Sequence, residues 1–441
     1  MNSSFINKIQ TILEGSLGKV ASKLSTEKHI NSLKSGMMFT LPFTLLGGFV
    51  MILMFLPIPS GIEPTNWFYS LLLNIQTWGS SSLVLKTLYN LSLGLISVYT
   101  VIGISYSLSE EYKLKSSYTC LTSLFVFLAI TVEVAKNESG LNSISINYLD
   151  ASGMFVAIIV AMLTVEVSRL LKKHNITIRL PESVPPMVSA PFELLIPLIV
   201  NVFLFVGGNE LLKIGLGYGV VNLLTNILAP FLSASESLPA VVLINVIVMI
   251  FWLFGIHGAA LMAAIIGPLQ TANLTANAAA VASGAAMTHV FAGSFKSIFA
   301  TQIMYNALLI AVLIFAKSPR LRTLCKFSFI PNLFNINEPL IFGLPIVMNV
   351  ILVVPILLTT ILNTIVSYLM MSFDIVGKIY IYFLPTFPAP INAFLSTMDW
   401  KAPVMWFILF AANLLIFYPF IKVFDKQVIE EDKIALEGGN G

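Results

Sequence analysis

Charged residues are scarce in this chain of 441 residues, since Asp, Glu, Lys and Arg together make up 10% of it and 57% is hydrophobic. Soluble domains carry about 25% charged residues. The composition therefore excludes a soluble fold and predicts an integral membrane protein. The net charge is only +3, and no basic run is interleaved with exposed aromatic residues, which argues against nucleic acid as a partner.

Cysteine is nearly absent, and so are the motifs of soluble enzymes. Cys120 and Cys325 lie far apart without a CxxC companion, which indicates two small apolar fillers rather than a disulfide or a metal site. The chain has no Gly-rich phosphate loop, no His/Cys metal spacing and no Gly-x-Ser-x-Gly elbow. We therefore expect no metal and no cofactor. The absence of an ATP-binding domain excludes a self-contained primary pump.

Long apolar runs recur between Met37 and Phe420, and a membrane helix needs about 20 such residues. Short segments of strict alternation are absent, so the spans are helical. The sequence predicts an all-α polytopic membrane protein with about ten transmembrane helices, two re-entrant hairpins and amphipathic surface helices. The expected spans are residues 37–56, 83–108, 117–134, 154–171, 187–206, 238–267, 298–316, 345–370 and 405–421.

Four regions are expected along the chain: an amphipathic segment 1–35, a membrane half 36–236, a second membrane half 237–424 and a tail 425–441. No cleavable signal peptide is visible in residues 1–34. Basic residues gather in residues 1–35 and 169–179. The positive-inside rule places such segments in the cytoplasm. We therefore expect a cytoplasmic N-terminus, and a cytoplasmic tail as well.

Two polar stretches interrupt the second membrane half and are read as re-entrant hairpins, near residues 270–295 and 329–342. The first is rich in Ala, Asn, Thr and Gly but uncharged. Irregular backbone at membrane depth persists only against protein or a water-filled cavity. The two stretches therefore predict where the functional site lies.

Glu338 is the only acidic residue between Glu236 and Asp374, and an acid at the centre of a membrane helix costs roughly 2.5–3.5 kcal/mol. Together with Asn335 and Asn337 it offers the mixed amide and carboxylate partners that carbohydrate hydroxyls require. Pro339 suits the first turn of a following helix. Two structural alternatives stay open, namely a salt bridge to a distant lysine and a protonated acid satisfied by its neighbours.

His257 is the second candidate, because it lies between glycines in a run from residue 237 to 295 without a charged residue. A neutral imidazole that bonds a neighbouring helix is the structural alternative. The flanking glycines favour a functional site, since residues without a side chain let the backbone approach a ligand or another segment closely. In the first polar stretch Asn277 is a further candidate ligand, although packing between helices is the simpler explanation for Asn277 and His289.

The run from Phe334 to Pro345, Phe-Asn-Ile-Asn-Glu-Pro-Leu-Ile-Phe-Gly-Leu-Pro, closely resembles the membrane-spanning EIIC component of bacterial phosphotransferase sugar transporters. The resemblance is to the lactose, cellobiose and diacetylchitobiose branch. It extends to residues 254–258, to Lys317-Ser318 and to residues 418–420, and so covers essentially the whole chain.

The resemblance implies a homodimer in the bacterial plasma membrane, with a dimerising N-terminal half and a sugar-binding C-terminal half. Glu338 and His257 would contact the hydroxyl of a β-linked disaccharide that accepts phosphate. A phosphocysteine on a separate EIIB protein, supplied by EIIA and HPr, would donate the phosphate. The chain would thus be the membrane component of a sugar phosphotransferase, embedded in lipid.

Two other functions remain open at this stage. Glu338 and His257 could form the relay of a proton- or ion-coupled secondary transporter. A membrane sensor that no longer transports is suggested by three departures from the family pattern, at residues 293–297, 349–350 and 384–388.

Overall fold

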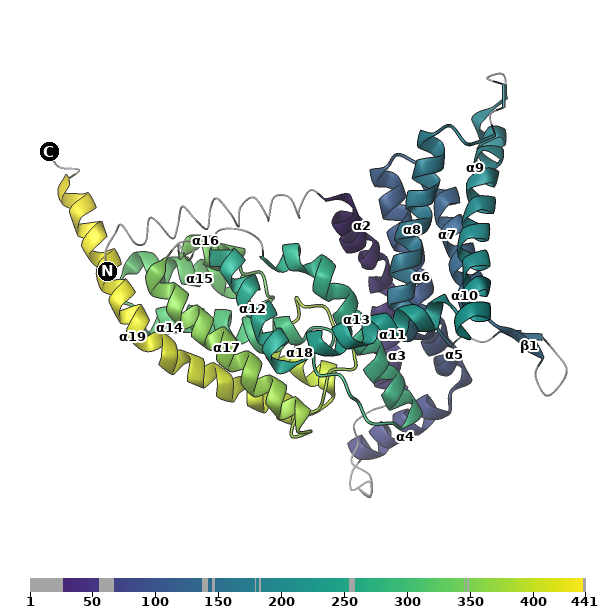
Figure 1. Ribbon diagram of the computed structural model, residues 1–441. Helices are drawn as coiled ribbons and strands as arrows, with labels where there is room; N and C mark the ends of the chain where they lie inside the picture. The colour runs from purple at the N-terminus through teal and green to yellow at the C-terminus, as the bar shows by residue number, and fades with distance from the viewer. Residues whose placement is uncertain are drawn as a thin grey trace. The chain divides into compact units, whose positions relative to one another are not determined.

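The computed structural model describes residues 27–54, 67–136, 142–144, 147–178, 180–181, 184–253, 258–344, 346 and 349–438 (Figure 1). These residues are mostly helical, and their β-structure is one antiparallel pair, β1 (Val134–Lys136) with β2 (Asn142–Ile144). The chain divides into two compact units. The first comprises Met1–Phe55, Asn66–Ala234 and Ala263–Ala276, and the second Leu56–Thr65, Ser235–Met262 and Asn277–Gly441.

The first unit is a bundle around α6, which packs on α2, α7 and α8. Its helices are α2 (Lys28–Met37), η1 (Met38–Thr40), α3 (Leu41–Met54), α4 (Trp67–Ser81), α5 (Leu83–Ser92), η2 (Leu93–Leu95), α6 (Ile96–Glu111), α7 (Ser116–Thr131), η3 (Ala151–Gly153), α8 (Met154–Lys173), α9 (Pro186–Val202), η4 (Phe203–Gly207), α10 (Gly208–Leu216) and α11 (Val220–Ser235). Ile104, Phe127 and Met154 are fully buried in its core. A hydrogen bond of 2.5 Å joins the hydroxyls of Ser123 and Thr164 across α7 and α8.

The first span begins earlier than the sequence predicted, because α2, η1 and α3 run on as one apolar helical segment from Lys28 to Met54. Glu27 caps α2 by accepting from the Ile30 amide at 2.9 Å. His29 lies between the carboxylates of Glu27 and Glu166, 2.9 Å from each. This cluster ties the start of α2 to α8 inside the first unit.

The second unit is built around α14, which packs on α15, α17 and α19. Its helices are α12 (Leu238–Leu253), the two ends of α13 (Gly258–Ser283), η5 (Lys296–Thr301), α14 (Gln302–Phe315), α15 (Pro319–Leu333), α16 (Glu338–Gly343), α17 (Val350–Ser372), α18 (Ala389–Thr397) and α19 (Lys401–Gly438). Met304, Leu308 and Val312 of α14 are fully buried in its core. The middle of α13, Ala263–Ala276, groups with the first unit.

Among the described residues, seven helical segments are long and apolar enough to cross a membrane, or eight if the bent pair α11 and α12 is one span. The sequence predicted about ten. Helix α7 has only sixteen residues, fewer than the roughly 20 that span a bilayer alone. The all-helical membrane fold is therefore confirmed, while the number of spans is not.

Three segments differ in detail from the sequence-based expectation. The fifth expected span does not end at residue 206, because α9 ends at Val202 and the helical backbone continues through the π-helical turn η4 into α10. Residues 57–82, between the first two expected spans, contain α4. The expected tail from residue 425 is the end of the 38-residue helix α19, and Asp425 there is buried and accepts from the backbone amides of Lys317 and Ser318 at 2.9 and 2.8 Å.

Candidate functional site

The turn between α15 and α16 presents Glu338, and its shape follows from a helix-capping motif. After Leu333 the Ile336 amide donates to the Pro331 carbonyl, and the Asn335 amide donates to the Asn332 carbonyl, both at 3.0 Å. This pairing is a Schellman motif, which needs one residue in the left-handed conformation. Asn335 supplies it with a φ of 59°, because asparagine tolerates that region better than most residues do.

Asn337 fastens the same turn to α14 through a buried amide network. Its Nδ2 donates to Gln302 Oε1 at 3.1 Å and to Asn335 Oδ1 at 3.0 Å, while its Oδ1 accepts from Asn332 Nδ2 at 2.6 Å. Gln302 in turn donates to Asn306 Oδ1 at 2.9 Å. Both amide hydrogens of Asn337 are therefore used within the protein, so the residue positions the turn.

Glu338 is the first residue of the short helix α16, with Pro339 in the first turn as the sequence predicted. Its side chain is half-buried. A carboxylate in the first turn of a helix is favoured by the helix dipole. The turn thus holds an acid at the edge of the amide network, where a hydroxyl group could approach it.

His257 lies outside the described residues, as do Phe254, Gly255 and Ile256. Its neighbour Gly258 begins α13, and a Cβ atom added there would lie 2.3 Å from the Val248 carbonyl oxygen of α12. Real Cβ atoms do not approach a backbone oxygen so closely. The expected close backbone approach beside His257 is therefore present at Gly258.

Asn277, the candidate ligand in the first polar stretch, joins three segments of the second unit. Its Nδ2 donates to the carbonyls of His289 and Ile379 at 2.7 and 2.8 Å, and its Oδ1 accepts from the His289 amide at 3.1 Å. The side chain is fully buried. It satisfies backbone groups of two irregular segments, as irregular backbone at membrane depth requires.

His289 forms a pair with Glu236 that the sequence did not suggest. Its Nδ1 lies 2.8 Å from Glu236 Oε2, and the Tyr368 hydroxyl donates to the Glu236 carbonyl at 2.8 Å. The two side chains are 32% and 18% exposed, so they are accessible to polar groups. The pair joins the start of α12 to the irregular segment before η5.

The sequence reasoning also missed the residues that hold Glu338 in place, namely Gln302, Asn306 and Asn332. A signal existed, because Gln302 and Asn306 lie one helical turn apart in an otherwise apolar span. Their partner Asn337 was visible only as a candidate ligand. The turn therefore presents one carboxylate, that of Glu338, which can accept a hydrogen bond from a hydroxyl group.

Comparisons with known proteins all point to one protein family, and the relatives match nearly the whole chain. A family model described as "Phosphotransferase system, EIIC" matches residues 34–360. The oligo-beta-mannoside-specific EIIC component of Bacillus subtilis (strain 168) is 29% identical over 94% of this chain and 93% of its own length. The cellobiose-specific EIIC component of Geobacillus stearothermophilus is 28% identical, with 96% and 95% covered.

A solved structure is also similar. The crystal structure of ChbC, the IIC component from the N,N'-diacetylchitobiose-specific phosphotransferase system, superposes with a TM-score of 0.86 at 27% identity. It covers 96% of this chain and 99% of the other.

Proposed function

Because the chain belongs to the phosphotransferase-system EIIC family, we propose that it carries a β-linked disaccharide of the cellobiose or diacetylchitobiose type across the plasma membrane. The sugars for which its relatives are named support this class. The sugar is then phosphorylated by a separate EIIB protein, which EIIA and HPr supply with phosphate. The transporter acts as a homodimer, with both termini in the cytoplasm.

The observation that carries the proposal is the placement of Glu338 at the start of α16. It follows directly after Asn337, whose amide hydrogens are both bonded within the protein. Phosphoryl transfer depends mainly on positioning and electrostatics. Glu338 accepts a hydrogen bond from the hydroxyl that receives phosphate and eases loss of its proton. His257 is the second proposed ligand of the sugar, and Asn335 offers its half-buried side chain at the turn that carries Glu338. Asn337 and Asn277, assigned from sequence as ligands, contribute by holding the irregular backbone.

The test is EIIB-dependent phosphorylation of a panel of disaccharides by the purified protein in vesicles, with Glu338→Gln. Glutamine keeps the shape but loses the charge and basicity. We expect the rate with saturating phospho-EIIB to fall by about 100-fold or more, as for loss of a general base. Glu430→Gln is the matched control, since Glu430 is an exposed glutamate of the same unit, and its rate should stay within threefold of wild type.

Full phosphorylation by Glu338→Gln would refute the role assigned to Glu338. Uptake that a protonophore abolishes and that needs no phosphodonor would instead favour the proton-coupled transporter.

A further inference from the structure

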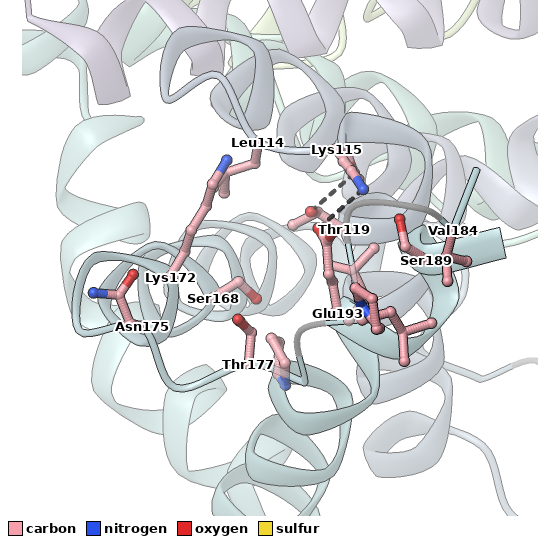
Figure 2. A pocket seen from close by; sticks show the side chains of 14 residues that line it. Leu114, Lys115, Thr119, Ser168, Lys172, Asn175, Thr177, Val184, Ser189 and Glu193 are labelled. Atoms are coloured by element: carbon pink, nitrogen blue, oxygen red, sulfur yellow. Dashed lines mark hydrogen bonds and ion pairs between the residues drawn. The ribbon is translucent and has the colours of Figure 1, made fainter. Parts of the chain in front are cut away.

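The first unit contains a polar cavity of about 530 Å³ where one end of α7, α8 and α9 meets (Figure 2). This volume lies within the range of small-molecule sites, about 300–1,000 Å³. Lys115 and Glu193 lie together on one side of the cavity, and Lys172 extends along the other (Figure 2). The residues that line the cavity belong to the first unit, whereas Glu338 belongs to the second.

The charges of this cavity have a definite pattern. Lys115 Nζ lies 2.9 Å from Glu193 Oε2, with both side chains more than a third exposed. Lys172 Nζ donates to the Lys113 carbonyl at 3.0 Å and keeps further hydrogens for another acceptor. Two ammonium groups and one carboxylate therefore face the same space. Such a set suits a zwitterion, whose phosphate meets the lysines and whose ammonium meets the glutamate.

An apolar groove of about 450 Å³ continues from the cavity between α7 and α9. Leu194 lines both the cavity and the groove. Along α7 the groove extends from Tyr118 to Leu128, about 15 Å at 1.5 Å per residue. Half the hydrocarbon core of a bilayer is also about 15 Å. The groove therefore has the length of one acyl chain in one leaflet.

The groove is open on its outer side, because Leu121 and Phe125 are 58% and 55% exposed. Helix α9 contributes Leu195, which is 42% exposed. A face of this kind is covered by lipid or by protein. Protein that covered the cavity would bury its three charged groups, which is costly unless each is paired. A phospholipid avoids that cost, since its head group remains at the membrane surface.

We propose that the cavity and the groove together bind one phospholipid with an amine-bearing head group, such as phosphatidylethanolamine. The phosphate lies between Lys115 and Lys172, the ammonium donates to Glu193, and one acyl chain fills the groove. The lipid joins α7 to α9.

Native mass spectrometry of the full-length protein tests this site, with equimolar phosphatidylethanolamine, phosphatidylcholine and phosphatidylglycerol added in a neutral detergent. Phosphatidylcholine has the same net charge but its quaternary ammonium donates no N–H bond, and phosphatidylglycerol has no ammonium. We expect phosphatidylethanolamine to be retained about tenfold more than either. Equal retention of the three lipids, or stronger retention of phosphatidylglycerol, overturns the proposal.

Variants of the cavity and the groove test whether these residues cause the lipid preference. Glu193→Gln should abolish the preference for phosphatidylethanolamine over phosphatidylcholine, and Lys172→Ala should lower retention of all three lipids. Lys173→Ala is the matched control, because this neighbouring lysine does not line the cavity, and it should change nothing. Leu195→Trp, which fills the groove, should also lower retention of all three.

The competing occupant of the groove is a second copy of this chain. If Leu121→Cys forms disulfide-linked dimers in high yield while no lipid is retained, the groove is a protein interface and the proposal is wrong.

Discussion

Asn337 uses its whole side-chain amide inside the protein, and this decides what a substitution there does. Both hydrogens point at oxygen atoms, of Gln302 and Asn335. A buried hydrogen bond contributes about 1 kcal/mol, but an unsatisfied buried partner costs about 1–3 kcal/mol. The residue next to the proposed sugar ligand Glu338 is thus a stability element.

Asn337→Asp should therefore destabilise the protein by about 2–4 kcal/mol, because it replaces Nδ2, which donates both hydrogen bonds, with a carboxylate oxygen that faces two other oxygens. Thermal unfolding in detergent measures this. Asn74→Asp is the matched control, since Asn74 is an exposed asparagine of α4, and it should change stability by less than about 0.5 kcal/mol. Equal melting temperatures for Asn337→Asp and wild type would contradict the hydrogen-bond network.

At the residue scale, the sequence revealed which side chains were unusual but not which atoms they meet. Glu338 was visible because it is the only acid in a long stretch of the chain. Its supports were not, since Asn337 bonds Gln302 across 35 positions and His289 meets Glu236 across 53. Hydrogen-bond partners so distant in sequence depend on how helices pack.

At the scale of elements, the passage from α12 to α13 depends on a close approach at Gly258. Gly258→Ala should impair folding and sugar phosphorylation together, because the new Cβ would meet the Val248 carbonyl and displace the segment that carries His257. We expect a loss of about 2 kcal/mol or more, of the size found for overpacked sites. Melting temperature and phosphorylation rate are the two measurements.

Gly267→Ala in the same helix is the matched control, because the structure places no described atom within 4 Å of its added Cβ. It should stabilise α13 by up to about 1 kcal/mol, the difference between glycine and alanine in a helix. If both substitutions have the same effect, the close approach at Gly258 is not what fixes the segment.

The π-helical turn η4 shows why element boundaries were harder to predict than elements. Gly207-Gly208 usually ends a helix, yet here Gly207 is the last residue of η4 and Gly208 the first residue of α10, so the helical backbone continues from α9 through both glycines. Each glycine in a helix costs about 1 kcal/mol relative to alanine, but this cost does not end the helix here. Hydropathy predicted that a span exists, whereas its end depended on backbone geometry that composition does not encode.

For the molecule as a whole, the two units have separate hydrophobic cores. Phe127 is fully buried in the first core and Phe417 in the second. The core of each unit consists largely of residues from spans that hydropathy identified. The grouping of Ala263–Ala276 with the first unit was not predictable, because it depends on contacts between distant segments.

Thermal unfolding should accordingly show two steps, as proteins with several domains often do. Phe127→Ala should lower only one transition and Phe417→Ala only the other, since each removes about 3–5 kcal/mol from one core. Differential scanning calorimetry, with intrinsic fluorescence as a second probe, measures both transitions. A single transition that both variants lower equally would show that the units unfold as one.

Helix α19 has a consequence for anything attached beyond it. Its 38 residues extend about 57 Å, and about 30 Å suffices to cross the hydrocarbon core, so roughly 27 Å of helix remains. A domain fused directly to the end of α19 would have an orientation set by the helix. That orientation rotates about the helix axis by about 100° for each residue inserted into the helix. In such a fusion, the rotation about the helix axis affects the orientation of the attached domain more than the added length does.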